Sequence, residues 1–160
     1  DGGVYDNLGM EPMFDVGKQE IKNELTVPVD FLIVADAGAP FMRRNIPMPL
    51  NPFRLRRVAD IGFDQARALR IRAFVNFLRS NPRSGMYLQI GSIPQSGINS
   101  YAKAENIVEI IKAHNWFTDE QVKVASSYKT DLCQMDAERF DSISEHGYQT
   151  SLWNELVFLQ

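Results

Sequence analysis

The first nine residues form the stretch with the clearest chemical content. They read DGGVYDNLG. A carboxylate such as that of Asp1 can accept a proton as a general base, and adjacent glycines allow sharp turns and close backbone approach. An Asp-Gly-Gly triplet by itself commonly marks a turn, so its interpretation depends on the residues that surround it.

Other reactive residues are few. His114 and His146 are the only histidines, and the side chains next to His146 in sequence point in different directions on a helix, so we expect no triad there. Cys133 is the only cysteine, which excludes an intrachain disulfide and a cysteine cluster for zinc. Asp36 follows an apolar run, at a place where α/β proteins often build sites, but a turn aspartate is the favoured interpretation.

Two strands and a long helix between them are predicted. Residues 31–35 are an unbroken, β-branched-rich apolar run, which predicts a strand buried on both faces. Residues 86–91 predict a second strand. Residues 54–78 are good helix formers with apolar residues on more than one face, and the sequence NPRSG at residues 81–85 ends that helix.

The rest of the chain predicts helices. One covers residues 103–114, and another starts at Thr118, because Thr118 and Gln121 have the spacing of a capping box. The last covers residues 136–158, with Gly147 inside it as a close-packing point or a break. The predicted fold class is therefore α/β, but two strands do not make a stable sheet. We expect residues 1–160 to be part of a larger fold, in agreement with a chain that begins at an aspartate.

The extended context of the first motif resembles the patatin-like phospholipase family. In that family an Asp-Gly-Gly block is followed a few residues later by Asn-Leu, and the matching residues here are Asp1, Gly2, Gly3, Asn7 and Leu8. The family often has proline after Asn-Leu, whereas this chain has a glycine. The resemblance covers nearly the whole chain, but only this block is catalytically specific.

Two further segments support the resemblance. Residues 36–41 (DAGAPF) are similar to the Asp-Ala-Gly segment of bacterial members, and residues 130–132 (TDL) with residues 147–148 (GY) are similar to their C-terminal helical region. The resemblance implies that residues 1–160 are the C-terminal portion of a patatin-like three-layer α/β/α catalytic domain. About two central strands and several helices of that domain lie in this chain.

The resemblance also implies a chemistry, namely hydrolysis of lipid acyl esters by a serine–aspartate dyad. Asp1 is then the base that hydrogen-bonds the serine hydroxyl directly, with Gly2 and Gly3 shaping the turn after it, and no cofactor is needed. The serine belongs to a Gly-x-Ser-x-Gly elbow, which is absent here; the nearest similar residues lie in an expected loop at 91–97. We expect the nucleophile in a missing N-terminal portion of the same parent, and no activity from this chain alone.

Charge and composition limit the classes of binding partner that we expect for this chain. A net charge of −3 gives no general case for nucleic acid. The segment 41–57 is locally basic and apolar, and Phe41, Arg43, Arg44 and Phe53 are candidates for contact with an anionic lipid surface. The alternative is an ordinary long loop with its arginines in water. A lipid or acyl ester is the expected substrate, with a cytoplasmic or membrane-peripheral location favoured.

A second function from another class stays open. The chain could be a non-catalytic lipid- or protein-interaction module from a parent that lacks the nucleophile. A Gly-x-Ser-x-Gly motif upstream in the parent would favour the enzyme, and its absence would favour the module. Clustered metal ligands are not apparent in the sequence.

Overall fold

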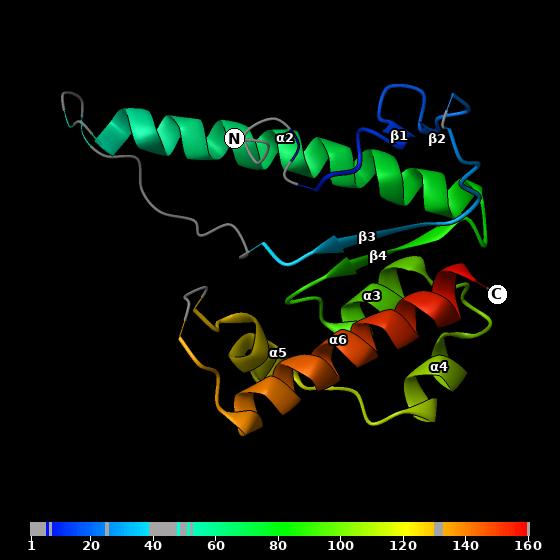
Figure 1. Cartoon of the computed structure of the whole chain (residues 1–160). Coiled ribbons are helices and arrows are strands. Elements are labelled where there is room, and N and C mark those ends of the chain that lie inside the picture. The colour runs from blue at the N-terminus through cyan, green and yellow to red at the C-terminus, as the bar shows by residue number, and fades with distance from the viewer. Residues whose placement is uncertain are drawn as a thin grey trace. The chain divides into compact units, whose positions relative to one another are not determined.

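The computed structural model describes a mixed α/β protein with five helices and two small sheets among its described residues (Figure 1). Those residues are 6, 8–24, 26–38, 48, 51, 53–129 and 133–159. The chain divides into two compact units. The first holds residues 1–30 and 40–77, and the second holds residues 31–39 and 78–160.

The first unit is organised around aromatic side chains. Strands β1 (Phe14–Asp15) and β2 (Glu20–Ile21) form a short antiparallel hairpin that the sequence analysis missed. Phe14 is 1% exposed, and its ring meets those of Phe74 and Phe77 edge-on at centroid distances of 5.3 and 5.4 Å. Such edge-to-face contacts add to the free energy gained by apolar burial.

Helix α2 (Phe53–Ser80) confirms the long helix predicted for residues 54–78. Its start at Phe53 means that the arginines at positions 54, 56 and 57 lie on a helix rather than in a loop. Within the part of the chain that the structure describes, no helix has the length and apolar character needed to cross a membrane.

The second unit contains a two-stranded parallel sheet, β3 (Leu32–Asp36) and β4 (Gly85–Gln89) (Figure 1). Both strands lie where the sequence predicted them. The chain passes from one to the other through α2, as parallel strands require a long connection. Helix α6 (Ala137–Phe158) packs against β4, and α3 (Pro94–Tyr101) packs against α6.

The prediction that the first strand is buried on both faces was wrong. Burial alternates along β3, so that Leu32, Val34 and Asp36 are buried while Ile33 is 55% exposed and Ala35 is also exposed. An unbroken apolar run specifies which residues tolerate burial, but a second covering layer must be present to bury both faces. Among the described residues only one face of β3 is well covered.

Two helix predictions need correction. The stretch at 91–97, expected to be a loop, enters α3, whose first residue is Pro94; proline suits the first turn because the amide there has no helical partner. The helix expected at 103–114 is shorter, since α4 is Ile107–Ala113 with His114 as its C-cap.

Local start signals were more reliable. Thr118 and Gln121 form the predicted capping box at the start of α5 (Asp119–Ser126), and Asp136 caps α6 by accepting a hydrogen bond from the Arg139 amide. The role expected for Gly147 was wrong. Helix α6 runs through that position unbroken, and a Cβ there would meet nothing within 4 Å.

Gly85 is where the sheet tolerates no side chain. A Cβ there would lie 2.2 Å from the Leu32 carbonyl oxygen and 3.2 Å from Leu78 Cδ2. We expect Gly85→Ala to lower the free energy of unfolding by about 2 kcal/mol, because the strands must move apart. Urea denaturation followed by tryptophan fluorescence measures this, since both tryptophans, Trp116 and Trp153, lie in the second unit.

The matched control is Gly147→Ala, also in the second unit. Its added methyl group enters open space on a helix, so it should raise the free energy of unfolding by about 0.5–1 kcal/mol. Equal effects of the two substitutions would contradict the close approach at Gly85.

Candidate functional site

Two buried polar side chains of the second unit, Asp36 and His146, lie at the carboxyl end of the β3–β4 pair. Asp36, the last residue of β3, is 3% exposed. Its Oδ2 accepts a hydrogen bond from the Tyr87 hydroxyl at 2.8 Å, and its Oδ1 accepts one from the Gly38 amide at 3.0 Å. The second contact is the local turn interaction expected of a turn aspartate. The first ties β3 to β4 beneath the strand ends, which the sequence did not indicate.

His146 of α6 borders the same site opposite the strand ends. The side chain is 1% exposed, its Nε2 accepts a hydrogen bond from the Gly91 amide at 2.9 Å, and the Phe117 ring stacks on it. Gly91 has φ +82°, a conformation that favours glycine. An accepting Nε2 assigns the proton of the neutral ring to Nδ1. Nδ1 has no hydrogen-bond partner among the described residues.

Burial sets the protonation of this histidine. Removal of the imidazole from water disfavours the charged form and lowers the pKa of His146 below its usual value of 6.5. The neutral ring therefore acts as a hydrogen-bond acceptor for the Gly91 amide. It links α6 to the loop after β4.

A hollow of about 310 Å³ lies beside these groups in the second unit. It is bordered by the ends of β3 and β4 and by one side of α6 that includes Ile143, Gly147, Thr150 and Ser151. The Ser151 hydroxyl donates to the Gly147 carbonyl oxygen within the helix, and the hydroxyl oxygen of Thr150 is buried and lacks a partner in the described structure. The arrangement suits a small apolar group and offers no nucleophile paired with a base.

Two side-chain amides of α6 fix the helix to its surroundings. Gln149 accepts a hydrogen bond from the Phe117 amide at 2.7 Å, and Asn154 accepts one from the Tyr87 amide at 3.3 Å. With His146 and Thr150 these amides form a buried polar stripe, in which His146, Thr150 and Asn154 are four residues apart and Gln149 lies three residues after His146. Sequence reasoning missed this stripe, although polar residues recurring at helical spacing were the signal that could have revealed it.

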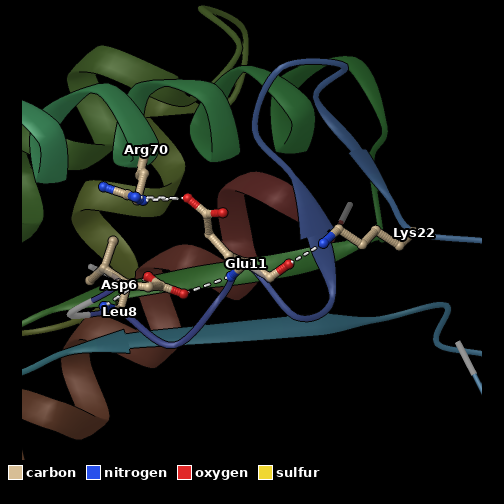
Figure 2. Close-up of polar contacts among 5 residues, drawn as sticks. All are labelled: Asp6, Leu8, Glu11, Lys22 and Arg70. Atoms are coloured by element: carbon tan, nitrogen blue, oxygen red, sulfur yellow. Dashed lines mark hydrogen bonds and ion pairs between the residues drawn. The ribbon is translucent and has the colours of Figure 1, made fainter. Parts of the chain in front are cut away.

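A separate polar network in the first unit holds the residues that follow the Asp-Gly-Gly block. Figure 2 shows Asp6 accepting hydrogen bonds from the Leu8 and Glu11 amides at 3.3 and 2.8 Å. Glu11 in turn pairs with the Arg70 guanidinium of α2 at 2.7 Å, and its carbonyl oxygen accepts a hydrogen bond from Lys22 Nζ (Figure 2). These contacts fix the backbone just after the block to α2.

Most residues of the predicted site lie outside the described residues. These are Asp1, Gly2, Gly3, Asn7, Phe41, Arg43 and Arg44. Phe53, the remaining lipid-contact candidate, is the first residue of α2 and is 66% exposed. The structure thus brings together Asp36, Tyr87 and His146, which the sequence did not connect, and leaves the catalytic proposal to other tests.

Comparisons with protein-family models, curated proteins and solved structures find no match to this chain. The resemblance to patatin-like phospholipases therefore rests on the sequence motifs and stays a prediction. In the part of the chain that the structure covers, no group of three or more histidine, cysteine, aspartate or glutamate side chains is arranged to hold a metal ion.

The buried His146 makes stability depend on pH. Its pKa is lowered on folding, so the unfolded chain binds the proton more readily; the free energy of unfolding falls as pH drops from about 6.5 through the lower folded-state pKa. We expect His146→Gln to reduce this decline, because glutamine can still accept the Gly91 hydrogen bond but does not titrate. Urea denaturation at about pH 7.5 and about pH 5.5 measures the difference.

His114→Gln is the control for that measurement, because His114 is exposed at the end of α4. This variant should keep the pH dependence of the original chain. If His146→Gln also keeps it, the burial of His146 does not control the titration.

Proposed function

We propose that this chain supplies the aspartate base of a serine–aspartate dyad lipid acyl hydrolase, with Asp1 as that base. The observation that carries the proposal is the Asp-Gly-Gly block followed by Asn7 and Leu8. Asp1 accepts the proton of a serine hydroxyl as that oxygen attacks the ester carbonyl carbon, and the alcohol leaves as the acyl-enzyme forms. Water then hydrolyses the acyl-enzyme.

The described structure is compatible with this assignment in two ways. The parallel β3–β4 pair, connected through a helix, is a unit from which α/β sheets are built. Polar contacts among Asp6, Glu11 and Arg70 also hold residues that lie close to the Asp-Gly-Gly block in sequence.

The nucleophile must come from elsewhere under this proposal. The 160 residues contain no Gly-x-Ser-x-Gly sequence. We propose that an N-terminal portion of the same parent carries it, together with the backbone amides that stabilise the oxyanion. The isolated chain is then inactive towards acyl esters.

The alternative is a non-catalytic lipid- or protein-interaction module. The observation that favours it is the exposure of neighbouring large apolar side chains in the second unit, Phe31 and Ile33. Exposed apolar residues that are not isolated often mark an interaction surface. A parent without a Gly-x-Ser-x-Gly serine would favour this function over hydrolysis.

The direct test is Asp1→Asn in the intact parent. Asparagine keeps the size of the side chain but cannot act as a base, so kcat for a p-nitrophenyl ester should fall by about a thousandfold. Asp30→Asn, the same change at an exposed position, should leave kcat unchanged. Full activity of the Asp1 variant would exclude Asp1 as the base.

A second measurement locates the nucleophile. The intact parent and the 160-residue chain are each treated with a serine-reactive fluorophosphonate, and their intact masses are compared. We expect one label on the parent and none on the chain. A parent that stays unlabelled would favour the interaction module.

Lipid contact has its own test in the parent. Arg43→Glu with Arg44→Glu should weaken binding to anionic phosphatidylserine vesicles by about tenfold or more, since each basic residue near such a surface contributes about 1 kcal/mol. Lys103→Glu with Lys112→Glu makes the same charge change at exposed positions outside that segment. Equal losses for both double variants would show an effect of net charge rather than a contact at 43–44.

A further inference from the structure

The two outer edges of the β3–β4 sheet differ in whether a side chain covers their backbone groups. In a parallel ladder alternate residues bond to the neighbouring strand. The Leu32 amide bonds to Ser84, and the Asp36 carbonyl oxygen accepts from Ile90, so residues 32, 34 and 36 face β4. The amide and carbonyl groups of Ile33 and Ala35 therefore point to the opposite edge of the sheet.

Helix α6 closes the outer edge of β4. The amides of Gly85, Tyr87 and Gln89 point away from β3, and the central one, that of Tyr87, donates to Oδ1 of Asn154 at 3.3 Å. Asn154 is fully buried, and its own side-chain amide donates to the Thr150 carbonyl oxygen. A buried side chain thus occupies the position that another strand would need.

The outer edge of β3 has no such protection among the described residues. No hydrogen bond in the described structure reaches the outward backbone groups of Ile33 or Ala35. Edge strands are normally guarded by lysine, proline, a bulge or a cover, whereas residues 31–35 read FLIVA. The side chains of Phe31 and Ile33 are 39% and 55% exposed. Over residues 31–35 the edge is apolar, uncharged and uncovered among the described residues, which are properties of a pairing surface.

We propose that the outer edge of β3 is a strand-pairing surface and that a second copy of this chain occupies it. Two β3 strands related by a two-fold axis at Val34 run antiparallel. Ile33 of one copy then lies opposite Ala35 of the other, and each such pair exchanges amide-to-carbonyl hydrogen bonds in both directions.

The side chains fit this register as well as the backbone. Large residues meet small ones, because Ile33 lies opposite Ala35 and Phe31 lies opposite Ala37. No charged residue lies opposite another between residues 31 and 37, so the symmetric pair carries no like-charge repulsion. The result is a four-stranded sheet with a β4 strand at each end, where Asn154 closes it.

The test is the mass of the 160-residue chain in solution, measured by light scattering after size exclusion over a series of concentrations. We expect a concentration-dependent dimer. Ile33→Pro removes one outward amide from each copy and leaves the β3–β4 ladder intact, so the dimer dissociation constant should rise by about thirtyfold. Ile33→Lys, a second variant without a backbone change, should also weaken the dimer.

Val108→Lys is the matched control, because Val108 is 57% exposed on α4, close to the exposure of Ile33. It should keep the dimer. Hydrogen exchange at the Ile33 and Ala35 amides should slow as concentration rises in the original chain only. A chain that is monomeric throughout, or a dimer that both Ile33 variants leave intact, overturns the proposal; the first result would assign the edge to a strand of another protein or of a longer parent.

Discussion

A backbone amide or carbonyl group that is buried without a hydrogen-bond partner costs more free energy than most side-chain contacts return. The second unit is built around this constraint. Among its described residues the sheet has two parallel strands, and pairing satisfies the backbone groups that face the partner strand but not those that point outward. At the outer edge of β4, the side-chain oxygen of Asn154 on α6 accepts a hydrogen bond from the Tyr87 amide. This contact, together with the burial of Trp153 and Phe158, holds α6 in place.

Other side chains of the buried polar stripe of α6 also provide hydrogen-bond partners for buried backbone amides. His146 accepts from Gly91 at the end of β4, and Gln149 accepts from Phe117 before α5. Each buried side chain replaces water at a backbone amide that is not part of a helix or strand ladder. A helix with an entirely apolar face would bury more hydrocarbon but leave these amides unsatisfied. Polar residues on this face therefore contribute to the uniqueness of the packing.

The two units differ in the kind of polar contact that stabilises them. In the first, the Asp6 carboxylate and the Glu11–Arg70 pair organise the chain just after the Asp-Gly-Gly block. Arg70 presents Nε and Nη2 to the same oxygen of Glu11, and charge-assisted contacts of this kind resist displacement better than neutral ones. In the second unit the contacts are mostly between neutral groups and backbone amides.

The sequence by itself determined the local elements: the long helix at α2, the capping box at Thr118 and the places of β3 and β4. These follow from propensity, caps and apolar runs, which act between residues near in the chain. Only the tertiary structure decided that β3 is exposed at Ile33, that Gly147 needs no close contact, and that His146 and Asn154 bind the ends and edge of the sheet. Such features depend on which layer covers a face and which distant amide lacks a partner. Periodicity along one segment contains neither piece of information.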